Sequence, residues 1–128
     1  MTIDRIDHFV LTVANLEATR LFYCEGLGME WVTFGGGRHA LGFGRQKINL
    51  HVRGQEFEPK AQTSLPGSGD FCLISQRPLE EWIAHLARLG IPLLLPPSPR
   101  TGATGPIRSI YLRDPDGNLV EISNEVVA

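Results

Sequence analysis

The stretch IDHFVLTVANLEATRLFYCEGLG (residues 6–28) places a strand-like segment that contains His8 directly before a helix-like segment. Further strand-like segments end at INLHV (48–52), which contains His51. The same order recurs in the second half, whose segments are GDFCLIS (69–75), LEEWIAHLARLG (79–90) and NLVEIS (118–123, with Glu121). Leu-Glu opens both helix-like segments and Leu-Gly closes both. This repetition predicts a duplicated module.

Each half is predicted to be a β-α-β-β-β module within one domain, with module one over about residues 1–54, a linker over 55–68 and module two over about 69–128. In module one, Asn15 is expected to cap the helix. In module two, we expect a short edge strand at 91–95 and a loop over the Pro/Gly-rich stretch 96–106. Asp116-Gly117 is typical of a hairpin turn between the last two strands.

Composition excludes several functional classes. The chain of 128 residues is 42% hydrophobic and 20% charged, with a net charge of −2, so it offers no basic field for a nucleic acid or a membrane surface. No segment is long and apolar enough to span a bilayer. Two separated cysteines, Cys24 and Cys72, favour a reducing compartment, and we therefore expect a cytoplasmic protein.

Strand alternation places His8 on one face with Val10 and Thr12, and His51 on one face with Lys47 and Asn49. Two imidazoles and the Glu121 carboxylate suit one borderline divalent ion, such as Zn, Ni, Mn, Co or Fe(II). Three protein ligands would leave positions open for water or a chelating substrate. Glu121 would stay a ligand or act as a base on the substrate.

The segments DHFVLTVANLEATRLFYCEGLGM (7–29), KINLHV (47–52) and SIYLRDPDGNLVEIS (109–123) resemble the vicinal oxygen chelate superfamily, the group of glyoxalases, bleomycin-resistance proteins and extradiol dioxygenases. The resemblance implies an α+β fold in which two βαβββ modules form a half-open curved sheet around a metal. It also implies metal ligands at His8, His51 and Glu121. The fourth position falls on Phe71, which would mean no fourth ligand, or, with one inserted residue, on Asp70, which would be a fourth ligand.

Three functions remain open. The first is a metal-dependent glyoxalase-like lyase or isomerase, whose substrate chelates the metal through vicinal oxygens. The second is an Fe(II) extradiol-type dioxygenase that uses a 2-His-1-carboxylate triad. The third is a non-catalytic protein that binds a small molecule or an antibiotic. In the first two, Glu121 is the candidate catalytic residue.

Substrate contacts are expected from residues in or next to the Pro/Gly-rich loop, because arginine grips carboxylate or phosphate groups in a bidentate manner. By analogy with the family, we expect a homodimer whose metal site lies within one chain or is shared between two. The expected partner is a small-molecule substrate. The candidate substrate-binding residues are Arg100, Thr101, Arg108 and Tyr111.

Overall fold

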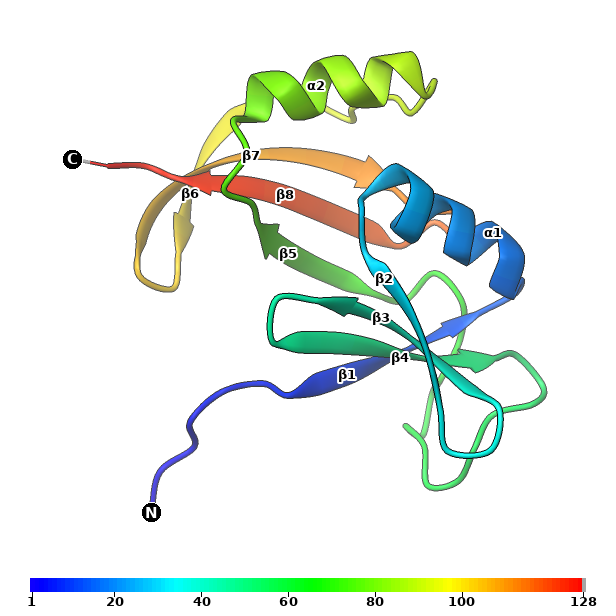
Figure 1. The fold of residues 1–128 in the computed structure, drawn as a ribbon. Helices are drawn as coiled ribbons and strands as arrows, with labels where there is room; N and C mark the ends of the chain where they lie inside the picture. Colours follow the sequence, from blue (N-terminus) through cyan, green and yellow to red (C-terminus); the bar gives the residue numbers. More distant parts are fainter. Residues whose placement is uncertain (128) are drawn as a thin grey trace. The chain divides into compact units, whose positions relative to one another are not determined.

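The computed structural model describes residues 1–127 and divides into two compact units, Met1–Ser68 and Gly69–Ala128. Each unit is a βαβββ module with one four-stranded sheet, shown in Figure 1. The predicted duplicated α+β fold is therefore confirmed. The polar stretch 55–68, predicted to be a linker, belongs to the first unit.

In the first unit the sheet has the strand order β1-β4-β3-β2, with β1 and β4 parallel and the other pairs antiparallel. One helical segment begins as an α-helix, α1, and continues as a π-helix, η1. The elements are β1 (His8–Val13), α1 (Leu16–Arg20), η1 (Leu21–Gly26), β2 (Glu30–Phe34), β3 (Arg38–Phe43) and β4 (Gln46–Val52).

The helical segment starts where the sequence predicts. The side chain of Asn15 accepts a hydrogen bond of 2.8 Å from the backbone N–H of Ala18, which satisfies a donor that the first helical turn would otherwise leave unpaired. After the segment the chain turns at Gly28, whose φ of 79° favours a residue without a side chain.

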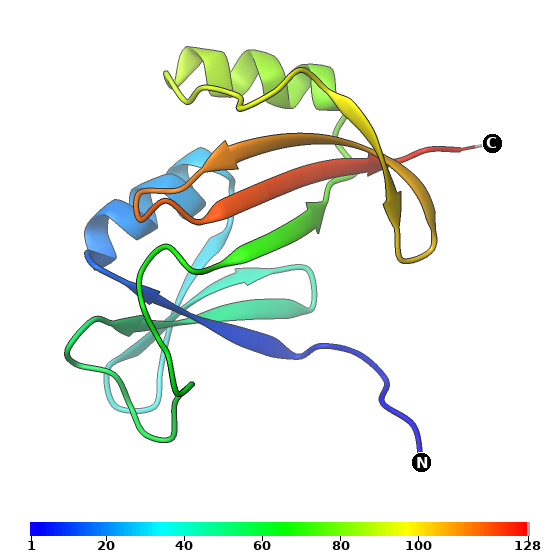
Figure 2. The same ribbon diagram turned by 180° about the vertical axis from the view of Figure 1, so that it is seen from behind.

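The second unit repeats this plan with the strand order β5-β8-β7-β6, in which β5 and β8 are parallel. Its helix α2 lies along one face of the sheet, as Figure 1 and the reverse view in Figure 2 show. The elements are β5 (Asp70–Ile74), α2 (Leu79–Arg88), β6 (Ser98–Gly102), β7 (Gly105–Arg113) and β8 (Leu119–Glu125).

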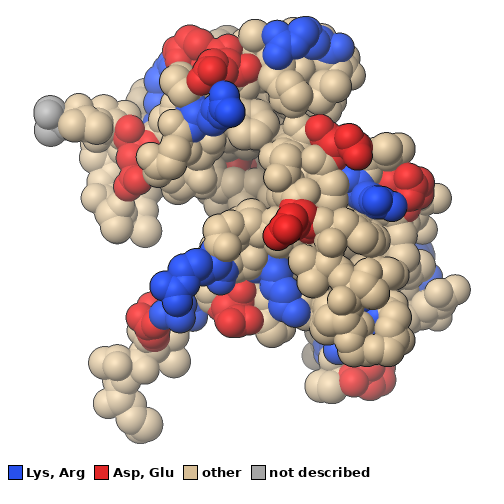
Figure 3. Space-filling view, in the orientation of Figure 1, with Lys and Arg blue, Asp and Glu red and all other residues tan. Residues whose placement is uncertain are grey.

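Acidic and basic side chains are interspersed on the face of the molecule that Figure 3 shows.

The prediction of the edge strand was wrong. Residues 91–95 form no strand, and β6 instead runs through the stretch that was predicted to be a loop. An edge strand pairs on one side only, so it tolerates a residue such as Pro99 that lacks an N–H donor. Residues 91–95 keep one link to the sheet, a 2.9 Å bond from the N–H of Leu94 to the carbonyl of Tyr111.

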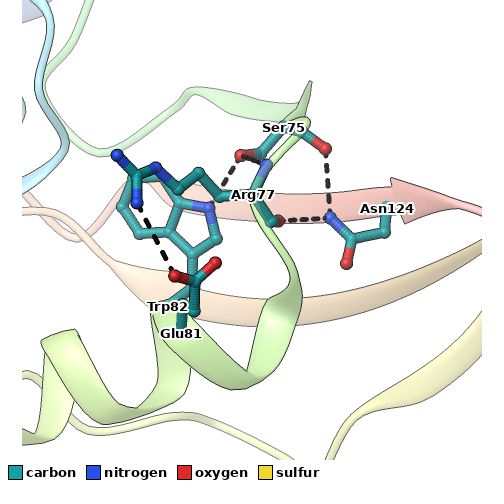
Figure 4. A network of polar contacts seen from close by, with 5 residues as sticks. All are labelled: Ser75, Arg77, Glu81, Trp82 and Asn124. Carbon is teal, nitrogen blue, oxygen red and sulfur yellow. Dashed lines mark hydrogen bonds and ion pairs between the residues drawn. The ribbon is translucent and has the colours of Figure 1, made fainter.

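Asn124 on β8 fastens the start of α2 (Figure 4). Its side-chain oxygen accepts a 2.8 Å hydrogen bond from the N–H of Leu79, and its amide donates to the carbonyls of Ser75 and Arg77 at 3.0 and 2.8 Å. Ser75 also accepts a bond of 2.8 Å from the indole of Trp82.

Among residues 1–127, no helix is long and apolar enough to cross a membrane.

Replacing Asn124 with alanine should lower the free energy of unfolding by about 1–3 kcal/mol, because it leaves a helical donor and two carbonyls without partners. Urea unfolding followed by circular dichroism measures the change. Thr104→Ala, which removes only an exposed 3.3 Å contact to Glu125, serves as the control. Equal stability of the two variants would contradict the role of Asn124.

Candidate functional site

Strand pairing decides which side chains share a face of the first sheet. The parallel register sets His8 opposite Lys47, Val10 opposite Asn49 and Thr12 opposite His51, and residues paired in this way point to the same side. The apolar face contains buried side chains such as Leu11 and Ile48. The opposite side is called the polar face of the first sheet, and it includes His8, Thr12, Phe34, Arg38, Ala40, Gly42, Lys47, Asn49 and His51.

His8 opens β1 at the exposed end of this polar face, where 43% of its side chain is accessible. Its Nδ1 lies 2.8 Å from Oδ1 of Asp7. This hydrogen bond lowers the pKa of Asp7 below its ordinary value and holds the imidazole with Nε2 pointing away. A carboxylate behind one ring nitrogen is typical of histidines that bind metal through the other.

His51 is in a different environment. It is only 2% exposed, and within residues 1–127 neither ring nitrogen has a hydrogen-bond partner. The ring of Phe57 stands edge-on to it, with the centroids 5.7 Å apart. Burial, helped by the charge of Arg38, lowers the pKa of His51 below its ordinary value, so the imidazole is neutral at neutral pH.

The structure does not bring His8 and His51 together. Since His8 pairs with Lys47, the two histidines are offset by four residues along neighbouring strands, a distance of about 13 Å. Two nitrogens that bind one ion each lie about 2 Å from it. The expectation that His8 and His51 of one chain bind the same metal must therefore be corrected.

Asn49 is the residue on this face that the sequence reasoning passed over. It lies between the two histidines, two residues further along the sheet than His8, and it is only 5% exposed. Its side-chain oxygen has no hydrogen-bond partner among the described residues. Strand alternation places Asn49 on the same face as His51 and could have indicated it, but an amide is a less common metal ligand than an imidazole.

In the second unit, Glu121 lies on the sheet face that points away from α2. The Ser109 hydroxyl donates to its Oε2 at 2.6 Å, and the Ser123 hydroxyl lies 3.3 Å from the same oxygen. The two serines are fully buried with their hydroxyls 2.6 Å apart, so Ser123 donates to Ser109 while Ser109 donates to the carboxylate. This chain of hydrogen bonds fixes the orientation of the carboxylate through Oε2.

The register also decides between Asp70 and Phe71. Asp70 pairs with Leu119, two residues before Glu121, and therefore shares the face of Glu121. Phe71 pairs with the buried Val120 and points to the opposite side, toward the face that bears α2. By orientation, Asp70 is the equivalent of His8.

Aligning the modules on His8 and Asp70, the first residues of β1 and β5, gives a further correspondence. Lys47 then matches Leu119, since each pairs with that first residue. Two residues further along, Asn49 matches Glu121, and His51 matches Ser123. The expectation from the sequence that His51 and Glu121 match is therefore corrected by the register.

The four candidate substrate residues divide between the two faces of the second sheet. Tyr111 pairs with Glu121, and its hydroxyl accepts a 2.8 Å bond from Nε of Arg100, so both lie on the face of Glu121. Thr101 and Arg108 lie on the other face. There Arg108 forms a 2.6 Å ion pair with Glu80 of α2, in which both side chains are exposed.

A groove of about 330 Å³ lies in the first unit against Asp7 and Lys47, which neighbour His8 in the chain and in the register. The groove is lined by Asp7, Glu30, Val32, Gly42, Phe43, Gly44, Arg45, Gln46 and Lys47.

Within neither unit do three His, Cys, Asp or Glu side chains of residues 1–127 come close enough to hold a metal.

The family model described as the glyoxalase/bleomycin resistance protein/dioxygenase superfamily matches residues 5–122. The chain belongs to this superfamily. The match covers both modules and all the candidate ligands, so the resemblance seen in the sequence is confirmed.

Two relatives extend this assignment. "Virulence protein STM3117" of Salmonella typhimurium is 54% identical over 126 residues, which are 98% of this chain and 88% of that protein. Its crystal structure covers 98% of this chain and 100% of its own, with a TM-score of 0.96. "Glyoxalase domain-containing protein RDO1" of Mycosarcoma maydis is 48% identical over 124 residues, 97% of this chain and 70% of that protein.

Among more distant members, the lactoylglutathione lyase from Agrobacterium tumefaciens is 26% identical with a TM-score of 0.73, over 96% of this chain and 95% of its own. TnmS3, an antibiotic-binding protein from Streptomyces, shares the fold at 21% identity, with a TM-score of 0.77 over 98% and 99% of the two chains. The superfamily fold thus occurs in both an enzyme and a binding protein.

The surroundings of Glu121 can be tested through Cys72, its partner in the register. Desolvation raises the pKa of the Cys72 thiol, the Ser123 hydroxyl lowers it, and the charge of Glu121 raises it further. In a Cys24→Ser background, Glu121→Gln should therefore speed alkylation of Cys72 by iodoacetamide several-fold, and Ser123→Ala should slow it, because only the thiolate reacts. Rate changes in the same direction would contradict this arrangement.

Proposed function

We propose that the chain is a divalent-metal-dependent, glyoxalase-like lyase or isomerase that acts on a small substrate with two adjacent oxygens. The main support is the register of the paired strands. It places His8 of the first module and Asp70 of the second at equivalent positions, and likewise Asn49 and Glu121. The likeness to a lactoylglutathione lyase adds to it.

The side chains present fit a divalent metal. Each module supplies donors of the types that Zn, Ni, Mn, Co or Fe(II) accept: an imidazole nitrogen from His8 and an amide oxygen from Asn49 in the first, and a carboxylate oxygen from Glu121 in the second. Each has a feature expected of a ligand: His8 is backed by Asp7, Glu121 is oriented by two hydroxyls, and Asn49 has an unpaired buried oxygen. Asp70 is a further candidate.

A bound divalent ion would polarise a substrate oxygen and so acidify the neighbouring carbon. The residues of the chain would do the rest. Because the Ser109 hydroxyl bonds to Oε2 of Glu121, the other oxygen would either bind the metal or, once released from it, accept a proton from that carbon. The groove lined by Asp7 and Lys47 offers room for the body of a small substrate.

The register favours a lyase or isomerase over a ring-cleaving dioxygenase. The dioxygenase proposal requires two imidazoles and one carboxylate at a single iron, and the offset between His8 and His51 denies a single chain that set. We extend the proposal to a homodimer in the cytoplasm, which fits the two free cysteines.

Elemental analysis after loading with each divalent ion should find about one equivalent of metal per chain, as in a mononuclear catalytic site. His8→Ala and Glu121→Ala should lose it, because each removes a proposed ligand. His51→Ala should retain the metal, and so should the control His85→Ala on α2.

Loss of metal in the His51 variant to the same extent as in the His8 variant would contradict the assignment of His8, and not His51, as a metal ligand. If the native protein took up no ion under any loading condition, the enzyme proposal would be abandoned.

Glu121→Gln should lower turnover by roughly 10²–10⁴-fold, as expected for loss of a catalytic base. The hemithioacetal of methylglyoxal and glutathione is the first substrate to assay, by thioester formation with the metal-loaded protein. Arg113→Met, an exposed change at the end of β7, is the control. No turnover by native protein would exclude lactoylglutathione lyase activity, and an unimpaired Gln variant would exclude a base role for Glu121.

A further inference from the structure

Two cations converge on one aromatic ring on the polar face of the first sheet. Nζ of Lys47 lies 3.8 Å from the centroid of the Phe34 ring, and the guanidinium carbon of Arg38 lies 5.3 Å from it. Arg38 is also 4.7 Å from the ring of Phe57. Gly42 and Ala40, the residues of β3 between Lys47 and Phe34, are small and leave the lysine side chain room to reach across.

Neither cation has an anionic partner. Lys47 and Arg38 form no ion pair among residues 1–127, and Nε of Arg38 is buried without any hydrogen-bond acceptor. Two half-buried positive charges near one ring repel each other, and burial deprives them of water. The aromatic rings offset part of this cost, and a bound anion would offset more of it.

The carboxylates around this face are engaged elsewhere or remain apart. Asp7 bonds to His8 at 2.8 Å, Glu56 accepts a 2.9 Å bond from the N–H of Gly54, and Glu58 pairs with Lys60 at 3.5 Å. Glu30, at the other end of β2, forms no ion pair with either cation. The charge of Lys47 helps to lower the pKa of Asp7, but no carboxylate of residues 1–127 forms an ion pair with either cation.

Two neutral groups beside the cations are also unsatisfied. Both nitrogens of His51, opposite Arg38 on the neighbouring strand, and the side-chain oxygen of Asn49 are buried without partners. Buried polar atoms without partners are rare and cost about 1–3 kcal/mol each. The N–H of a neutral His51 can donate to an oxygen of a ligand held by the two cations, whereas the Asn49 oxygen is an acceptor and forms no hydrogen bond with an oxyanion.

We propose that Lys47 and Arg38, held on the ring of Phe34, bind the oxyanion group of the substrate, a carboxylate or a phosphoryl group. The inference rests on the proposed function only in assigning this anion to the substrate. It gives the substrate class as a small organic anion, whose charged group is bound by the first module.

Binding of the anion alone tests the proposal without any metal. Inorganic phosphate and, separately, acetate are titrated into metal-free protein at constant ionic strength, and ¹H–¹⁵N spectra report the affinity and the residues that respond. Lys47→Met and Arg38→Met, which keep side-chain length but remove the charge, should each weaken binding about tenfold or more. Arg53→Met, which removes an exposed charge just after β4, should leave binding unchanged.

The two probes distinguish the sources of the oxyanion, since a phosphoryl site prefers phosphate and a carboxylate site prefers acetate. Arg38→Lys separates charge from shape, because it keeps the charge and loses the planar donor set. A native protein that binds neither anion, or an Arg53 variant that weakens binding as much as the Lys47 variant, would overturn the proposal. His8→Ala should lose metal yet keep anion binding, so failure of the metal site and failure of the anion site give different results.

Discussion

The parallel pairing of the first and last strands of each module is the constraint on which the rest of the structure depends. Strand side chains alternate, so a shift of one residue between β1 and β4 would turn every polar side chain of one strand into the apolar face. The buried apolar side chains of these strands oppose such a shift, because the shift would expose them. The same packing that stabilises the sheet therefore fixes the positions of His8, Lys47, Asn49 and His51.

The two polar faces differ in how their buried groups are satisfied. In the second unit, Ser123 bonds to Ser109 and Ser109 bonds to Glu121, each at 2.6 Å, which keeps one carboxylate orientation without a ligand. In the first unit, Asn49 and His51 are buried without partners among residues 1–127. Unsatisfied buried groups destabilise a fold, so their presence on one face supports the proposal of a ligand in the first unit.

The fold could be predicted from the sequence because its signals lie within short segments. The order of strand-like and helix-like segments repeats in the two halves, and Asn15 precedes the first helix. The sequence was insufficient where pairing decides. Strand β6 was missed because an edge strand tolerates proline, and the match of Glu121 with Asn49 rather than His51 required the register, which relates residues far apart in the chain. Arg108 was judged by its residue type alone, and its ion pair with Glu80 arises only once α2 packs on the sheet.

The two modules differ in charge at equivalent points of their sheets. The first module has Lys47 and Asn49 where the second has Leu119 and Glu121. Under the proposed function, the second module would supply the carboxylate that a divalent metal requires, and the first would supply the positive charge that an anionic substrate requires. The exchange of these few polar residues leaves the apolar face of each sheet unchanged, so the chemistry of a module changes while its fold is kept.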